Sequence, residues 1–327
     1  MKIIVDAFGG DNSPDSVIKG AYLAAKDNID IILTGKQSII ESKMKEFGLE
    51  PNPHITIVNA EDKILGEDEP VKAIKEKKDS SMVVGLRLLA DGVGDAFVSA
   101  GNTGAVLAGA TLIIRRLKGI KRAALATVIP TAKGPAILTD CGSNVVCKPE
   151  YYPQFAMMGS AYLEAVIGEK NPKVGLINIG TEETKGTETV LEAYALLKEN
   201  SNINFGGNCE ARDVLKGDFK VMVADGFTGN VILKVIEGVA KEITGSMKEM
   251  FFKNIATKVS ALIMKKGLKE FKKKYDYKEH GGAPILGLNK PVIKAHGSSN
   301  DYAIYKAIIQ ADTFAKQGVI EKIQKNI

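Results

Sequence analysis

Phe97-Val-Ser-Ala-Gly-Asn-Thr-Gly-Ala-Val-Leu-Ala108 is the stretch that decides the fold of this chain. It predicts the end of a buried strand, a tight turn of small residues and the start of an apolar helix. Gly101 and Gly104 allow positive φ angles and a close approach of backbone to a ligand. Asn102 and Thr103 are suited to cap the helix, whose first amides have no intrahelical partner and attract anions. The turn therefore indicates an anion site, although small residues in such turns also occur without a ligand.

The same arrangement returns at Val221-Met-Val-Ala-Asp-Gly-Phe-Thr-Gly-Asn-Val-Ile-Leu233. An apolar strand again leads through a turn containing Gly and Thr into an apolar helix. Neither loop carries a Walker or a dinucleotide-binding fingerprint. Two such loops in one chain indicate a site between strand ends that takes a small anion. The residues assigned to phosphate or substrate binding in these loops are Asn102, Thr103, Gly104 and Asp225.

Strands and helices alternate over most of the chain, which predicts a three-layer α/β protein with a largely parallel sheet. Apolar residues make up 45% of the chain and aromatic residues only 6%, with no Trp. An interior of Val, Ile, Leu and Ala is typical of buried parallel strands. No linker rich in Pro or Ser divides residues 1–327, so we expect one α/β domain. A basic helical excursion at about 241–278 is expected to rise from it, with its longest helix following Asn230 and a break near Gly267.

Further polar residues follow other predicted strands. Asp6 ends the first strand, where open α/β sheets bind ligands, or it caps a loop there. Lys185 follows the strand at 174–180 and is expected on the side of the sheet where both anion loops emerge; the alternative is a solvated side chain. His296 and the Ser298-Ser299 pair follow a strand at 292–295. They indicate either a third anion-binding turn or a packed turn.

Composition excludes several classes of site. The three cysteines, Cys141, Cys147 and Cys209, come without a secretory signal and predict a reducing cytoplasm rather than a disulfide framework. Their spacing does not match a zinc knuckle and the chain has only three His, so we expect no structural metal. No nucleophile motif or cofactor fingerprint is present, and no apolar run approaches the ~18 residues that span a bilayer. The protein is expected to be soluble or peripheral.

Positive charge is concentrated in one region. Lys241 to Lys274 holds ten Lys and three Glu, a balance of +7 against +5 for the whole chain, so the rest carries −2. Such a region favours an acidic partner: nucleic acid, an anionic membrane or an acidic protein. Apolar residues of 250–264 share one helical face, which predicts a dimer or core helix, or an apolar face held on a membrane. The residues expected to contact a membrane are Phe251, Phe252, Ile255 and Val259.

Five motifs follow one another along the chain: Val5-Asp-Ala-Phe-Gly-Gly-Asp11, Ser99-Ala-Gly-Asn-Thr-Gly-Ala105, Asn178-Ile-Gly-Thr-Glu182, Asp225-Gly-Phe-Thr-Gly-Asn-Val231 and Val292-Ile-Lys-Ala-His-Gly-Ser-Ser299. Together they resemble the bacterial phosphate acyltransferase (PlsX) family of phospholipid synthesis. The resemblance implies transfer of a long fatty acyl group from acyl-acyl carrier protein (acyl-ACP) to inorganic phosphate. The product, acyl-phosphate, would then serve a membrane glycerol-3-phosphate acyltransferase. It also implies a cytoplasmic homodimer, peripheral at the inner face of the membrane, with a fold similar to phosphotransacetylases and isocitrate/isopropylmalate dehydrogenases.

Two catalytic positions follow from the resemblance. Lys185 stands before Gly186 as in the family's loop, and Asn230 follows Thr-Gly. Phosphate is expected to bind between the 102–104 turn and Lys185 and to attack the thioester directly, without a covalent enzyme intermediate. Lys185 would stabilise the phosphate charge while Asn230 helps to hold the oxyanion. Departures from the family pattern are Phe8 in place of Met, Ser143 in place of Ala, and Val146 in place of an acidic residue.

Other functions stay open. A coenzyme A-dependent phosphotransacetylase has the same expected fold; an NAD-linked dehydrogenase also does, but the chain lacks a dinucleotide fingerprint and a clear metal-binding Asp cluster. A non-enzymatic membrane-surface or nucleic-acid-binding module would use the Lys-rich helix. Nucleic acid is not expected, because few aromatic residues there can stack on bases. Those residues are Phe251, Phe252, Phe271, Tyr275 and Tyr277. The basic region is suited to dock acidic ACP, the membrane or both.

Overall fold

The computed structural model describes residues 1–268 and 281–327. The strands are β1 (Lys2–Asp6), β2 (Asp30–Gly35), β3 (Ile55–Asn59), β4 (Ala96–Ser99), β5 (Ala124–Thr131), β6 (Gly134–Thr139), β7 (Lys173–Asn178), β8 (Asn204–Glu210), β9 (Val221–Val223), β10 (Ala283–Leu286) and β11 (Val292–Lys294). The α-helices are α1 (Asp15–Lys26), α2 (Gln37–Glu46), α3 (Pro70–Glu76), α4 (Ser81–Ala90), α5 (Thr103–Gly109), α6 (Tyr152–Tyr162), α7 (Glu188–Glu199), α8 (Gly226–Phe252), α9 (Ile255–Ile263), α11 (Asp301–Lys316) and α12 (Val319–Lys325).

The strands form one mixed sheet in the order β3-β2-β1-β4-β11-β10-β5-β6-β9-β7-β8. The five strands from β3 to β11 are parallel to one another, and so are the four strands from β6 to β8. The two groups run in opposite directions, because β10 is antiparallel to β11 and to β5, and β5 is antiparallel to β6. The expected α/β fold with a mostly parallel sheet is confirmed, and its two parallel halves are joined through an antiparallel centre at β10 and β5.

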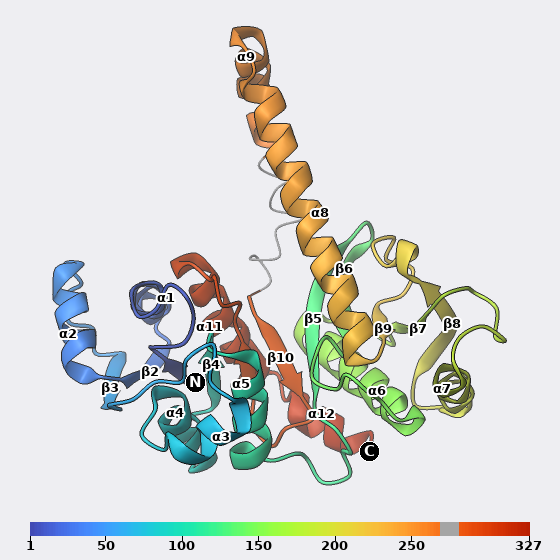
Figure 1. Ribbon diagram of the computed structural model, residues 1–327, viewed down its shortest axis with the longest axis horizontal. Coiled ribbons are helices and arrows are strands. Elements are labelled where there is room, and N and C mark those ends of the chain that lie inside the picture. Colours follow the sequence, from blue (N-terminus) through green and yellow to red (C-terminus); the bar gives the residue numbers. More distant parts are fainter. Residues whose placement is uncertain (269–280) are drawn as a thin grey trace.

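Helices cover both faces of the sheet, which gives the expected three layers (Figure 1). On one face, α1, α11, α6, α7 and α12 pack on strands of both halves in a single apolar cluster. On the other face, α3, α4 and α5 cover the first half, while the base of α8 lies over the second. The central strands are buried on both sides, as parallel strands between helices must be; Ile3, Ile4 and Val5 of β1 are at most 1% exposed.

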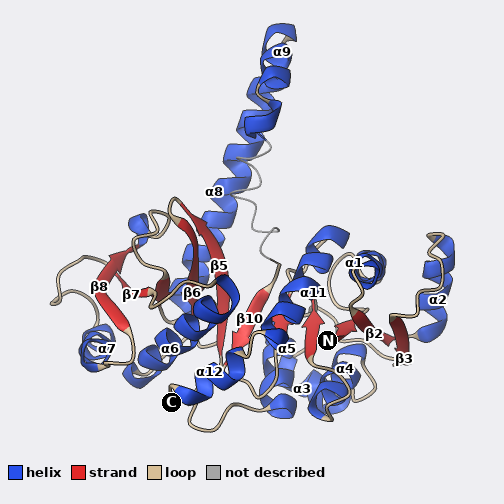
Figure 2. Cartoon of the chain, turned by 180° about the vertical axis from the view of Figure 1, so that it is seen from behind, coloured by secondary structure: helices blue, strands red, loops and turns tan. Residues whose placement is uncertain are grey.

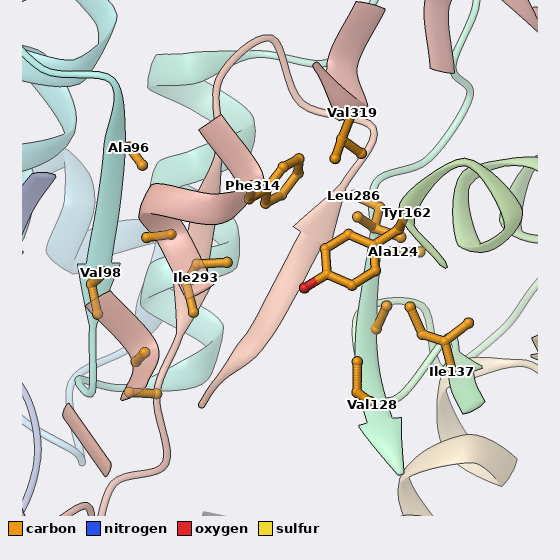
Figure 3. Packing of buried hydrophobic residues seen from close by; sticks show 14 of the residues in the cluster. Ala96, Val98, Ala124, Val128, Ile137, Tyr162, Leu286, Ile293, Phe314 and Val319 are labelled. Carbon is orange, nitrogen blue, oxygen red and sulfur yellow. The ribbon is translucent and has the colours of Figure 1, made fainter. Parts of the chain in front are cut away.

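The core continues across the antiparallel centre of the sheet. Figure 3 shows Val98 of β4 and Ile293 of β11 on one side of this centre and Val128 and Ile137 of β5 and β6 on the other. Above them, the ring of Tyr162 from α6 meets the ring of Phe314 from α11 edge-on, with centroids 5.6 Å apart. The two halves of the sheet therefore share one core.

The long helix differs from its prediction at both ends. It begins at Gly226, so Asn230 lies in its second turn rather than before it. It ends at Phe252, because Asn254 starts a new helix: its Oδ1 accepts from Thr257 N at 2.9 Å, and Thr257 Oγ1 accepts from Asn254 N at 3.1 Å. The break expected near Gly267 lies at Met264, where α9 ends, and 265–268 are helical again. The expected apolar face is kept on α9, which carries Ile255, Val259, Leu262 and Ile263, whereas Phe251 belongs to the end of α8.

The pair α8 and α9 projects far from the body, with α9 at the tip (Figures 1 and 2). Only Gly226, Gly229 and Leu233 of α8 are buried. The last part of the predicted excursion at 241–278, with Lys274, Phe271, Tyr275 and Tyr277, lies outside the described residues. In the described part of the chain, no helix is both long and apolar enough to cross a membrane.

Candidate active site

A cavity of about 500 Å³ opens where the two halves of the sheet meet. This is the size of an ordinary small-molecule site. Its apolar lining comes mainly from β5, α5 and α8, and its polar lining from the turns that follow β4 and β11 and from α8. The apolar lining includes Leu107, Leu125, Val128, Ile129, Leu233 and Ile236, and the polar lining includes Thr103, Thr127, Asn230, Lys234, Glu237, Lys294 and His296.

The turn between β4 and α5 places Thr103 and Gly104 in the cavity lining. Asn102 is not among the lining residues, because its side chain is used within the fold: Oδ1 accepts from Ala105 N at 3.0 Å and Nδ2 donates to Gly66 O at 2.7 Å. Asn102 is therefore the predicted helix cap. A Cβ on Gly104 would lie 2.7 Å from Pro70 Cγ, so contact with α3 requires glycine there as well.

Asp6 lies beneath this turn and does not line the cavity. It is 2% exposed, and its carboxylate accepts from Ser81 Oγ and Ser99 Oγ, both at 2.6 Å. Burial raises the pKa of Asp6 above its usual value, while the two serine hydroxyls act in the opposite direction. Ser99 Oγ also accepts from Gly101 N at 3.0 Å, so Asp6 shapes the turn through Ser99.

The end of β11 and the turn after it place two basic residues at the cavity. Lys294 is 7% exposed, and its Nζ donates to Ala100 O at 3.3 Å and to Ala295 O. Burial lowers the pKa of Lys294 to about 8. His296 Nδ1 lies 2.9 Å from Ser298 Oγ and accepts from Ser298 N at 3.2 Å; its partial burial lowers its pKa. Ser298 is not among the lining residues, so it positions His296.

Lys294 was missed by sequence reasoning. The motif around it was noted, but no role was given to the lysine itself. The available signal is a charged residue inside the otherwise apolar run Val292-Ile-Lys-Ala295, where every residue is buried. A lysine is almost never fully buried unless it is paired.

The turn between β9 and α8 brings Asn230 to the cavity. Asp225 caps α8, because Oδ1 accepts from Thr228 N and Oδ2 accepts from Thr228 Oγ1, both at 2.8 Å. Asp225 is not among the lining residues. A Cβ on Gly229 would lie 1.9 Å from Asp140 O, so only glycine lets α8 approach this closely. The close approach places Asn230 beside Gly142, which also lines the cavity.

Lys185 lies on an exposed loop between β7 and α7 and is not among the residues that line the cavity. The loop is held by its backbone: Asn178 Nδ2 donates to Lys185 O at 2.9 Å. Gly186 has a φ of +111°, which favours glycine. Lys185 was expected on the side of the sheet where both anion loops emerge. It emerges at the same strand ends as the Asn230 loop, because β7 runs parallel to β9, whereas β4 belongs to the half of the sheet that runs in the opposite direction.

The cavity contains one thiol, that of Cys141. The three cysteines are free and buried. Burial raises the pKa of Cys141 far above its usual value, and the nearby Asp140 adds to the effect. A thiol in this state is not a nucleophile at neutral pH.

The residues expected to contact a membrane lie at the projecting tip. Phe252 and Ile255 are 61% and 81% exposed, and Val259 is also exposed, whereas Phe251 is half-buried. The lysines around them are exposed as well: Lys253, Lys258, Lys265 and Lys266.

The structure resembles solved structures of known enzymes. A phosphotransacetylase from Streptococcus pyogenes superposes with a TM-score of 0.65 at 17% identity, covering 97% of this chain and 94% of that one. The EutD phosphotransacetylase from Staphylococcus aureus gives 0.64 at 17% identity, covering 96% and 94%. These identities show a shared fold alone. The expected likeness to phosphotransacetylases is confirmed.

The sequence has much closer relatives. The family described as fatty acid synthesis protein matches residues 1–322. A phosphate acyltransferase from Alkaliphilus oremlandii is 51% identical, covering 100% of this chain and 97% of the relative. A phosphate acyltransferase from Clostridium novyi is 47% identical, covering 100% and 98%. The chain therefore belongs to the fatty acid synthesis protein family, together with these phosphate acyltransferases.

Proposed function

We propose that this chain transfers a long-chain fatty acyl group from acyl-ACP to inorganic phosphate, giving acyl-phosphate for phosphatidic acid synthesis. The observation that carries the proposal is a cavity with an apolar wall beside a polar, cationic one. An acyl chain fits the wall formed by β5 and α8, and phosphate fits the wall after β4 and β11. The names of the relatives support the transfer to phosphate.

In this reaction phosphate is itself the nucleophile. Its oxygen forms a bond to the thioester carbonyl, and the carrier thiolate leaves, so no group of the enzyme becomes acylated. The raised pKa of the Cys141 thiol supports direct attack. Asn230 is placed to donate to the oxyanion. The catalytic role proposed for Lys185 requires its exposed loop to close on the cavity when substrate binds.

We also propose that two copies of the chain pair along α8. Val231, Val235, Val239 and Ile243 recur every fourth residue on this helix, and each is at least 45% exposed. Residues four apart lie on the same side of a helix, so they form an apolar stripe that nothing covers in the single chain. A second copy of the same stripe is its proposed partner.

The tip of the projection is proposed to contact an anionic membrane surface, near the membrane glycerol-3-phosphate acyltransferase that uses the product. Ile255, Leu262 and Ile263 are at least 70% exposed, and exposed lysines surround them. This combination is typical of helices that lie on anionic bilayers. The same lysines are suited to dock an acidic carrier protein, so the cytoplasmic face of the membrane is the proposed location.

The test is acyl-phosphate formation from palmitoyl-ACP and phosphate, with palmitoyl-coenzyme A in parallel. Product from the ACP thioester alone supports the proposal. Product only from the coenzyme A thioester favours the second candidate function, that of a phosphotransacetylase. This candidate is suggested by the solved phosphotransacetylases that share the fold. No product from either thioester contradicts both enzymatic proposals and favours a membrane-binding module.

A further inference from the structure

Lys294 is a buried cation that lines the cavity. Its Nζ gives two of its three N–H groups to backbone carbonyls, those of Ala100 and Ala295. Carbonyl groups satisfy hydrogen bonds but do not neutralise the charge. Within residues 1–268 and 281–327, no carboxylate forms an ion pair with Lys294. A buried charge without a counter-ion is costly, so this site favours an anionic ligand.

The nearest acids are committed elsewhere or are more distant. Asp6 accepts from two serine hydroxyls, and its charge reaches Lys294 only through space. Asp11 also acts only at a distance. On α8, Glu237 pairs with Lys234 at 2.7 Å. The polar wall of the cavity therefore has a positive charge at Lys294 that no acid of these elements cancels by contact.

The position of Lys294 is fixed by three chain segments. Ala295 N donates to Ser99 O at 2.9 Å, which joins the ends of β11 and β4. Asp11 N donates to Gly297 O at 2.8 Å, which joins the loop after β1 to the same turn. Because backbone bonds hold the turn on both sides, the ammonium group is presented in a preorganised place.

We propose that Lys294 binds inorganic phosphate in the cavity and holds it for attack on the thioester. The inference rests on the proposed function, and it adds to it a phosphate-binding residue, Lys294, that lines the cavity. The third N–H of Lys294 donates to a phosphate oxygen, while Thr103 and Gly104 line the same wall. The acyl chain then lies along the apolar residues of β5 and α8.

A pH dependence follows from this assignment. Burial lowers the pKa of Lys294 to about 8, so its charge is present at pH 7.5 and largely lost at pH 9. The facing groups are Asp6 and Asp11 beside β1, Lys234 and Glu237 on α8, and His296 in its own turn. His296 is neutral throughout, because its pKa is lowered from 6.5. Phosphate affinity is expected to fall about tenfold from pH 7.5 to pH 9.

The experiment is calorimetric titration of the full chain with inorganic phosphate at pH 7.5 and pH 9, without any acyl donor. Lys294→Met is expected to weaken binding at least tenfold at pH 7.5 and to remove the pH dependence. Lys294→Arg is expected to bind at both pH values, because guanidinium stays charged. The matched control Lys170→Met changes an exposed loop lysine and is expected to behave as wild type.

Unchanged phosphate affinity in a folded Lys294→Met protein overturns the inference. Where that variant does not fold, Lys294→Arg decides: a loss of phosphate affinity from pH 7.5 to pH 9 as steep as in the wild-type protein overturns the inference, because guanidinium stays charged over this range. The outcome is separable from the proposed function. If Lys294→Met forms acyl-phosphate with an unchanged KM for phosphate, the role of Lys294 is refuted and the proposed reaction stands. If phosphate binding depends on Lys294 but no acyl-phosphate forms, the phosphate site stands and the proposed reaction is refuted.

Discussion

Ser99 Oγ donates to the Asp6 carboxylate at 2.6 Å, which joins the carboxyl ends of two neighbouring parallel strands beneath the anion loop. The same Ser99 oxygen accepts a hydrogen bond from the backbone N–H of Gly101, the first glycine of that loop. The contact makes Asp6 part of the support for the cavity rather than part of its lining. Substitution of Asp6 is therefore expected to lower the free energy of unfolding of the protein.

Asp6→Ala is expected to destabilise the protein by about 1–3 kcal/mol, because the hydroxyls of Ser81 and Ser99 lose their buried acceptor. Urea denaturation measures the free energy of unfolding. Asp91→Ala removes an exposed carboxylate and is expected to change it by less than about 0.5 kcal/mol. Equal stability of both variants would contradict the supporting role.

Asn230→Ala is expected to fold normally and to lose about 100-fold or more in kcat, because one oxyanion donor is removed. Steady-state assays with palmitoyl-ACP and phosphate measure the effect. Asn202→Ala, on an exposed turn, is the matched control and is expected to keep wild-type rates. A kcat close to the wild-type value in Asn230→Ala would refute the role of Asn230 as an oxyanion donor.

Lys185→Ala is also expected to fold normally and lose most turnover, with Lys170→Ala as its control. The loop around Lys185 is exposed, so the loss is expected in kcat if closure delivers the charge to the transition state. A rise in phosphate KM with unchanged kcat would instead place Lys185 in ground-state binding. Normal kinetics would mean that Lys185 is only a solvated loop residue.

Ile255→Glu is expected to reduce binding to anionic vesicles, because it places a charge on an 81% exposed apolar residue at the tip. Liposome flotation measures the bound fraction. Val93→Glu changes an exposed valine on the body, and it should float as wild type does. Unchanged flotation of Ile255→Glu removes the proposed membrane contact at this residue.

Val239→Glu is expected to convert a dimer into monomers, because it introduces like charges into the middle of the α8 stripe. Light scattering after size-exclusion chromatography measures the mass. Leu196→Glu alters a comparably exposed leucine on α7 and should leave the mass unchanged. A wild-type protein that is already monomeric would refute pairing along α8.

The local units of the fold could be predicted from the sequence, because their signals are local. The stretch from Phe97 to Ala108 gives a strand, a capped turn and a helix start where they were expected. Strand β10 could not be predicted, since Pro284 lacks an N–H and argues against a central strand. Pro284 is tolerated opposite Ile293 of the nearby strand β11, and the next two residues, Ile285 and Leu286, pair with the distant strand β5.

Parts of the site could not be predicted either, because they depend on pairing and packing between segments that are distant in the sequence. Thr103, Gly104, Asn230 and His296 all line one cavity, as their turns suggested. Strand direction depends on long-range pairing, so the side on which Lys185 emerges was not available from its own loop. The burial of Lys294 depends on packing between three distant segments, which local sequence does not specify.

Helix α8 carries Asn230 near its base and Phe252 at its far end. At 1.5 Å per residue, these two positions are about 33 Å apart along the axis. The helix is therefore a spacer: if its tip rests on lipid, it sets the greatest height at which the chemistry can stand above the bilayer. That height is similar to the ~30 Å thickness of a hydrocarbon core, so an acyl product released from the cavity would have at most a comparable distance to cross before it reached lipid. Each turn added or removed would change the height by about 5.4 Å.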